Sequence, residues 1–309
     1  MAERRTDVYA RITAEIAAAI EAGAGSWKMP WHHEGAALSR PTNVVSARRY
    51  RGVNVLALWI AAQAAGHGAG LWGTYRQWAA VGAQVRKNER ATTVVLWKQI
   101  ARPDAKDGED GDEETPGRGR MVARAFSVFN VAQVDGYQPP VAASVAAVPG
   151  VEAADAFIAA LGVPITYGPH DAHYRIDLDH IFMPPRDAFD DTVAFYGTLI
   201  HEAAHATGAK HRLDRDFGGR FHGGARAIEE ITAELTAGFV LADLGLAHRP
   251  RPDHAAYVAS WLKELKHNAR AIFTAAAKAQ QAADWMHERQ GARRPPQLDC
   301  QDNTPSSQA

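Results

Sequence analysis

Apolar residues at helical spacing dominate the start of the chain. Ile12, Ile16 and Ile20 recur every four residues and predict an amphipathic helix over residues 9–22. Apolar residues on one face predict two more helices in this half of the chain, over residues 54–65 and 74–81. Each of the three segments is followed by a glycine, which is typical of helix ends.

The pattern changes to strand-forming residues after the third helix. Residues 92–97 and 122–131 are rich in β-branched and aromatic side chains. They are separated by a stretch rich in Gly, Asp and Glu, residues 103–119, which predicts a flexible acidic loop. Together these features predict a hairpin with a long loop and an α+β N-terminal domain spanning residues 1–138.

The second half is predicted to be a mainly helical domain over residues 151–288, and the whole chain to be α+β. Residues 139–150 consist largely of Pro, Ala, Val, Ser and Gly and predict an interdomain linker. The polar tail at residues 289–309 is expected to be disordered. Helices are expected at 151–161, 191–207 and 225–244, with one long helix over 253–285, and short strands at 165–167, 173–178 and 181–185.

Composition places the chain among ordinary globular proteins. Hydrophobic residues make up 46% and charged residues 22%, and the length allows two domains with a core each. The only cysteine is Cys300, which excludes an intrachain disulfide framework and indicates a reducing compartment. No apolar run is long enough to span a bilayer, and no signal-peptide pattern is present. We therefore expect a cytoplasmic protein with no membrane partner.

Charge and tryptophan content distinguish the N-terminal half. Outside residues 101–120, the first 140 residues carry 14 Lys and Arg against 7 Asp and Glu, and six of the eight tryptophans precede residue 98. Single-stranded nucleic acid is bound by cationic grooves with aromatic faces on which bases stack. The alternative is that the tryptophans form a core and the arginines a solvated surface; Trp59 and Trp97 lie in apolar patterns and are expected in the core. The candidate DNA contacts are Trp27, Lys28, Trp31, Arg48, Arg49, Tyr50, Arg51, Trp72, Tyr75, Arg76, Arg86, Lys87 and Arg90.

An H-E-x-x-H motif lies within the predicted helix at 191–207. His201 and His205 are four residues apart, so both imidazoles stand on one face and can bind one zinc ion. Glu202 lies beside the metal, where it could take a proton from the attacking water and pass it to a leaving amine. The neighbouring residues are apolar, which predicts a buried site of low dielectric.

A third protein ligand is expected from the next helix, because catalytic zinc sites usually have three. Glu230 is the first candidate, Glu234 the second and Glu229 the third. Glu230 and Glu234 share a helix face, so that Glu230 could bind zinc while Glu234 orients a histidine from behind. The alternative is that these acids form a solvated helix face. His211 and His222, in the intervening loop, are weaker candidates.

With these motifs in place, the sequence resembles the ArdC-type antirestriction family of conjugative plasmids, whose N-terminal domain also occurs in TraC-type plasmid primases. The resemblance covers about residues 6–285. In the C-terminal half it rests on residues 201–208, 211–213 and 229–235. In the N-terminal half it rests on residues 27–31, 50–54, 72–78, 85–91 and 129–134. The combination is specific, whereas the zinc motif alone is not.

The resemblance implies a single-stranded-DNA-binding domain followed by a zincin-like metallopeptidase domain, and protection of incoming plasmid DNA against host restriction. Two hypotheses follow. In the first, the protein is a zinc-dependent peptidase of the gluzincin type that cleaves an unidentified protein or peptide substrate, with Glu202 as general base. In the second, it shields DNA or assists conjugation, and its zincin domain is structural or a docking surface without turnover.

Overall fold

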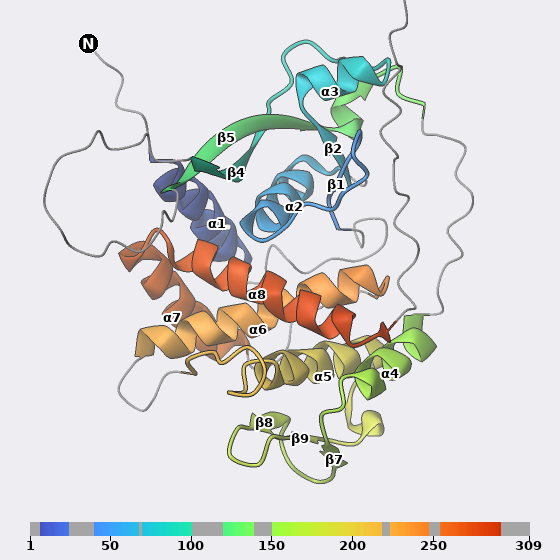
Figure 1. Cartoon of the computed structure of the whole chain (residues 1–309), viewed down its shortest axis with the longest axis vertical. Helices are drawn as coiled ribbons and strands as arrows, with labels where there is room; N and C mark the ends of the chain where they lie inside the picture. The colour runs from blue at the N-terminus through green and yellow to red at the C-terminus, as the bar shows by residue number, and fades with distance from the viewer. Residues whose placement is uncertain are drawn as a thin grey trace, which may run out of the picture.

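The computed structural model describes residues 7–24, 40–67, 70–100, 120–138, 150–217, 223–246 and 254–291. Two parts of the chain lie one against the other (Figure 1). The N-terminal part holds the larger sheet and the first three helices, and the C-terminal part is mainly helical with a small sheet. The chain is thus an α+β protein, as the sequence predicts.

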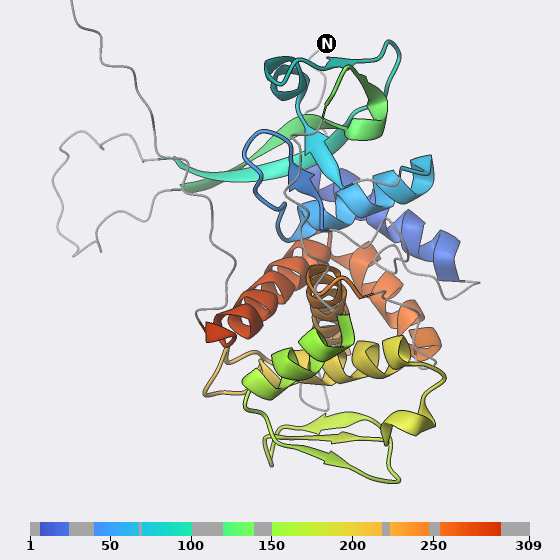
Figure 2. The same ribbon diagram turned by 90° about the vertical axis from the view of Figure 1, so that its right-hand side faces the viewer.

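The N-terminal part is built on a four-stranded sheet of order β1-β2-β5-β4. β4 (Thr92–Ile100) and β5 (Arg120–Asn130) form the predicted antiparallel hairpin, which extends sideways from the molecule in Figure 2. The predicted helices are α1 (Val8–Ala24), α2 (Val53–Ala65) and α3 (Tyr75–Ala80). The remaining elements are too short to show periodicity: β1 (Thr42–Asn43), β2 (Leu71–Gly73), β3 (Gln84–Val85), a 3-10 turn (Val131–Gln133) and β6 (Val134–Asp135).

The C-terminal part places a three-stranded sheet, of order β7-β9-β8, at the end of the molecule opposite the β4–β5 hairpin (Figures 1 and 2). α5 (Thr192–Ala206) packs between this sheet and α6 (Gly223–Asp243). α8 (Ala271–Glu288) packs on the other side of α6. The other elements are α4 (Gly150–Ala160), β7 (Ile165–Tyr167), β8 (His173–Arg175), β9 (His180–Met183), a 3-10 turn (Arg186–Ala188) and α7 (His254–His267).

The largest apolar cluster extends across both parts of the chain, and two smaller clusters lie within the N-terminal part. The isoleucines of α1 belong to the same cluster as buried residues of α6 and α8. The ring of Trp59 on α2 lies 5.9 Å from that of Phe239 on α6, measured between centroids. Thr13 Oγ1 on α1 also donates a hydrogen bond to the carbonyl oxygen of Ala269, at 2.6 Å. The predicted core residue Trp59 is confirmed as buried, and Trp97 packs at the edge of the same cluster.

The prediction of a single helix over residues 253–285 is wrong. α7 ends at His267, and α8 begins at Ala271 after a turn. Asn268 Oδ1 accepts a hydrogen bond from Arg270 N, and Ala271 N donates to the Asn268 carbonyl oxygen. An asparagine side chain that bonds nearby backbone competes with helical bonding, and no glycine or proline marks the break.

Several predicted segments fall wholly or mostly outside the described residues: the acidic loop 103–119, the linker 139–150 and most of the tail 289–309. The start of the predicted tail is ordered, since Gln290 Nε2 donates to the carbonyl oxygens of Phe157 and Met286. Among the described helices, none has both the length and the apolar character that crossing a bilayer requires.

Candidate metal centre and nucleic-acid surface

α5 holds the H-E-x-x-H motif on a buried face. Its N-terminus is capped by Asp191, whose Oδ1 accepts a hydrogen bond from Ala194 N at 2.8 Å. His201 and Glu202 are each 4% exposed. The Nε2 atoms of His201 and His205 lie 3.2 Å apart, because residues four apart share a helix face.

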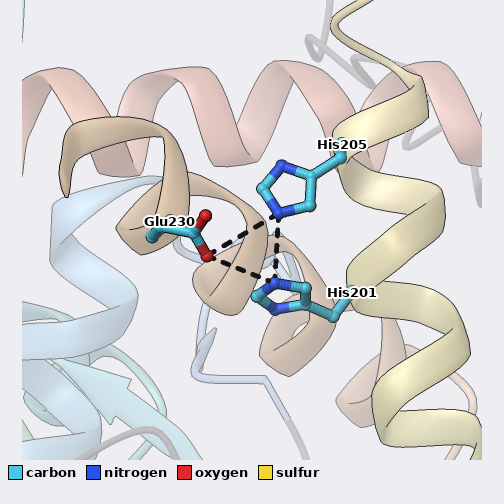
Figure 3. A group of neighbouring side chains, drawn as sticks. All are labelled: His201, His205 and Glu230. Carbon is cyan, nitrogen blue, oxygen red and sulfur yellow. Dashed lines mark hydrogen bonds and ion pairs between the residues drawn. The ribbon is translucent and has the colours of Figure 1, made fainter. Parts of the chain in front are cut away.

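α6 brings a carboxylate to the same point, as Figure 3 shows. Glu230 Oε2 is 3.6 Å from His201 Nε2 and 3.8 Å from His205 Nε2. The three ligand atoms all lie within 4.8 Å of one another, and no other group of three His, Cys, Asp or Glu in the described part of the chain does so. The first-ranked candidate from the sequence is therefore the glutamate that faces both imidazoles.

The other two candidate glutamates lie behind the histidines. Glu234 Oε2 is 3.2 Å from His201 Nδ1, and Glu229 Oε1 is 3.1 Å from His205 Nδ1. A carboxylate that accepts a hydrogen bond from Nδ1–H keeps the proton on Nδ1, and so leaves the Nε2 lone pair available to a metal ion. The arrangement matches the role considered for Glu234 in the sequence analysis, and it assigns Glu229 a parallel role on the second histidine.

The site concentrates negative charge in a buried place. Glu202, Glu229 and Glu234 are 4%, 3% and 0% exposed, and the Glu230 side chain is 14% exposed. Burial alone would lower the pKa of His205, but hydrogen bonds with Glu229 and Glu230 raise it to about 10. Burial likewise opposes ionisation of Glu230, yet the two histidines hold its pKa well below the ordinary value.

Positive charge is thus strongly favoured between the three side chains, and buried charges are normally paired or bound to metal. Two imidazole nitrogens and one carboxylate oxygen form the donor set of a His₂Glu catalytic zinc site. The residues present therefore fit a divalent cation.

A residue that the sequence analysis did not single out, Arg215, completes the site. It lies in the loop after α5, its side chain is 3% exposed, and it pairs with Glu229 at 2.8 Å. No spacing rule connects residues 215 and 229. The only available signal was that a buried carboxylate next to a histidine requires a counter-charge.

The structure places one of the predicted DNA contacts, Trp72, in the interior, and this corrects the prediction for that residue. Trp72 is 1% exposed and packs with Leu58 and Val94, so its ring offers no face to a base. Tyr50 is half-buried and packs against the core, and its hydroxyl accepts a hydrogen bond from Asn43 Nδ2. Trp27, Lys28 and Trp31 lie outside the described residues.

Two of the predicted basic contacts are paired with acids of the C-terminal helices. Arg49 Nη1 is 2.6 Å from Asp243 Oδ1 at the end of α6. Arg51 is ion-paired with Asp284 on α8. These contacts lie where the two parts of the chain meet, so these arginines are already engaged within the protein.

The remaining predicted contacts are exposed. Tyr75 is 52% exposed and borders a shallow groove of about 800 Å³ together with Arg86 and Lys87. Arg86 is partly neutralised by Glu89 at 2.8 Å. The other residues that line the groove are Gln84, Val85, Glu89, Phe129 and Asp135. The predicted contacts that are exposed elsewhere are Arg48, Arg76 and Arg90.

Two family models match the chain. The N-terminal domain of anti-restriction factor ArdC matches residues 6–129, and a zincin-like metallopeptidase domain matches residues 152–278. Protein y4eC of Sinorhizobium fredii is 54% identical over 92% of this chain and 93% of its own length. A DNA primase TraC of Escherichia coli is 34% identical over 93% of this chain, but only 27% of the primase is covered.

The fold is also that of a solved antirestriction protein. The metal-free crystal structure of ArdC from plasmid R388 is 37% identical, with a TM-score of 0.77 over 92% of this chain and 98% of that one. The Mn(II)-bound structure of the same protein has a TM-score of 0.72 at 35% identity, over 93% of this chain and 100% of that one. The paired domains, the clustered site residues and these full-length matches agree, and the chain belongs to the ArdC family of antirestriction proteins.

Proposed function

We propose that this antirestriction protein binds single-stranded DNA through its N-terminal part and hydrolyses peptide bonds at a zinc site in its C-terminal part. The observation that carries the enzymatic half is the convergence of His201, His205 and Glu230 within 4.8 Å. The carboxylates behind both histidines add to it, because such partners are typical of functional metal sites rather than of chance histidine pairs.

Zinc is the cation we propose, because a His₂Glu donor set on an H-E-x-x-H helix is typical of zinc peptidases. The related ArdC of plasmid R388 has been crystallised with Mn(II), which supports a divalent cation in this family. Manganese is therefore a competitor to be included in any metal analysis.

Glu202 is the residue that we propose as general base. It is buried beside the histidines, and its charge is close enough to contribute to the raised pKa of His205. A bound divalent cation would supply Lewis acidity to the scissile carbonyl. Glu202 would accept the proton of the attacking water and deliver it to the leaving amine nitrogen. Phe217, whose ring centroid is 6.4 Å from that of His205, places an apolar ring next to this histidine.

The test is Glu202→Gln, which keeps the shape of the side chain and removes its basicity. Metal content should stay stoichiometric, while cleavage of host proteins, measured by comparing proteomes of cells that express each form, should fall by roughly 10²–10⁴-fold. Glu288→Gln makes the same change at an exposed position of α8 and should have no effect. Identical proteomes, with antirestriction retained in Glu202→Gln, would favour a DNA-shielding protein whose zincin domain only docks partners.

Single-stranded DNA binding is proposed at the groove bordered by Tyr75, Arg86 and Lys87. An exposed aromatic ring beside cationic side chains is the combination that stacks bases and tracks phosphates. The relationship to TraC, which is named a DNA primase, supports a nucleic-acid ligand.

Anisotropy of a labelled mixed-sequence oligonucleotide tests this surface. Tyr75→Ala should weaken binding by roughly 5- to 150-fold, the equivalent of about 1–3 kcal/mol for one stacked base. Lys87→Ala should reduce the salt dependence of binding. Arg51→Ala is the matched control, since that arginine is already paired with Asp284. Equal losses in Arg51→Ala and Tyr75→Ala would remove this groove as the binding site.

A further inference from the structure

We infer that Arg215 is a positioning residue of the metal centre, which holds Glu229 behind His205 and thereby leaves Glu230 as the carboxylate that faces the cation. The inference rests on the metal site of the proposed function and adds a residue to it. It concerns the role of Glu229, which the sequence analysis ranked only as the third candidate ligand.

Arg215 pairs with both carboxylate oxygens of Glu229. Its Nε is 2.9 Å from Glu229 Oε2, and its Nη2 is 2.8 Å from Glu229 Oε1, which is a bidentate pairing. Glu229 Oε1 also contacts His205 Nδ1 at 3.1 Å. Both oxygens of Glu229 are therefore committed on the side of the histidine away from Nε2.

The arginine is itself fixed by the end of α5. Nη1 donates to Thr207 Oγ1 at 2.6 Å, and Nη2 donates to the Ala204 carbonyl oxygen at 2.7 Å. The backbone N of Arg215 donates to the Gly208 carbonyl oxygen at 2.9 Å, so the loop folds back on the helix that carries both histidines. A guanidinium with this many partners in a buried place has little freedom to move.

The close approach of this loop requires a glycine. A Cβ atom at Gly208 would lie 2.7 Å from Phe217 Cζ and 2.9 Å from Arg215 Nη2. Any larger residue at this position therefore displaces the guanidinium or the ring. The glycine that follows α5 therefore allows the loop to pack closely against the helix end.

Each histidine has a carboxylate behind it. Glu234 lies behind His201 and is 0% exposed, and Glu229 lies behind His205 and also pairs with Arg215. Without the arginine, Glu229 would be a buried carboxylate held only by His205 and free to turn toward the cation. The pairing thus keeps His205 Nδ1 protonated, its Nε2 directed at the cation and Glu230 as the third ligand.

The experiment measures metal affinity of the full-length protein, not its activity. Apo wild type and Arg215→Met are titrated with Zn²⁺ against a chromogenic chelator, and the visible spectrum of the Co²⁺ form reports the ligand geometry. We expect roughly 10- to 100-fold weaker binding in Arg215→Met, the usual effect of losing a partner behind a metal ligand, and an altered Co²⁺ spectrum. Arg215→Lys retains the charge without the bidentate pairing and should fall between the two. If Arg215→Met does not fold, the Zn²⁺ affinity of Arg215→Lys alone tests the inference.

The chain provides a matched control in Arg212, in the same loop. Its side chain is 8% exposed, pairs with Asp179 at 2.6 and 2.8 Å, and donates a hydrogen bond to the Ala206 carbonyl oxygen. Within the part of the chain that the structure describes, it forms no hydrogen bond or ion pair with Glu229, Glu230 or Glu234. Arg212→Met should lower thermal stability and leave Zn²⁺ affinity and the Co²⁺ spectrum unchanged.

Three results would overturn the inference, and they are distinguishable. Unchanged Zn²⁺ affinity in Arg215→Met, with metal bound by wild type, would remove Arg215 alone and leave the metal site intact. Equal losses in Arg215→Met and Arg212→Met would reduce the effect to general destabilisation. Absence of stoichiometric metal in wild type would remove the proposed metal centre, and this inference with it.

Discussion

Asp243 at the C-terminal end of α6 connects the two parts of the chain, and its removal should destabilise the whole protein. Its side chain is 2% exposed and pairs with Arg40 at 3.3 Å, Arg49 at 2.6 Å and His287 at 2.9 Å. Arg40 is also buried, with 5% of its side chain exposed. Burial lowers the pKa of Arg40, and the charge of Asp243 acts against this effect. The substitution Asp243→Asn would therefore leave a buried guanidinium without its neutralising carboxylate.

The magnitude follows from the burial of both partners. Breaking a buried ion pair by removing one charge typically costs about 3–5 kcal/mol, because the remaining charge stays desolvated. Arg40 keeps a hydrogen bond from its Nη2 to Gln280 Oε1 at 2.6 Å, which places the expected loss toward the lower end of that range. At roughly 2–4 °C per kcal/mol for a chain of this general size, the melting temperature should fall by about 10 °C.

The assay is thermal and urea unfolding followed by far-ultraviolet circular dichroism. Asp284→Asn is the control, because the Arg51–Asp284 pair is 62% and 36% exposed and such surface pairs contribute about 0–1 kcal/mol. The helical signal should fall in one transition in wild type, since α1 and α2 share a core with α6 and α8. A melting temperature within 2 °C or so of wild type in Asp243→Asn would refute the reasoning, as would an equal loss in Asp284→Asn.

Three further outcomes are expected. Burial raises the pKa of Asp243, but the hydrogen bond with His287 and the charges of both arginines outweigh it and hold the pKa below its ordinary value. The stabilisation from Asp243 should thus be fully present above about pH 4 and disappear as the pH falls further. The melting temperatures of wild type and Asp243→Asn should therefore become equal in acid. A difference in melting temperature that does not change with pH would contradict this. Trp72→Ala should lower the free energy of unfolding by about 3–5 kcal/mol in urea titrations, because the ring is buried. A loss below about 1 kcal/mol would be typical of an exposed side chain and would make Trp72 a candidate DNA contact again. Glu230→Gln should lose stoichiometric zinc in elemental analysis while Glu234→Gln retains it with weaker affinity, and equal metal content in both variants would argue against Glu230 as the ligand.

Local features of this protein were determined by the sequence alone. The spacing of His201 and His205 sets both imidazoles on one helix face, whatever the rest of the fold does, because the helical repeat is a property of adjacent turns. The β4–β5 hairpin was likewise predicted, because its two strands follow each other along the chain and are joined by one loop. The predicted bounds of α5, β4 and β5 lie within a few residues of their observed ends.

Long-range packing decided what local pattern could not. The sequence ranked Glu230 first among three glutamates of α6, but the role of Glu229 depended on long-range contacts. The approach of α5 and of Arg215 places Glu229 behind His205, as Glu234 lies behind His201. Whether an arginine is ion-paired or a tryptophan is buried depends equally on distant segments. Asp243 on α6 pairs with Arg49, and Leu58 of α2 and Val94 of β4 pack against Trp72. Charge and aromatic content can be counted along the chain, whereas burial and ion pairing are set by contacts between residues far apart in it. For this reason only the tertiary structure could show which of the candidate arginines and tryptophans are buried or ion-paired.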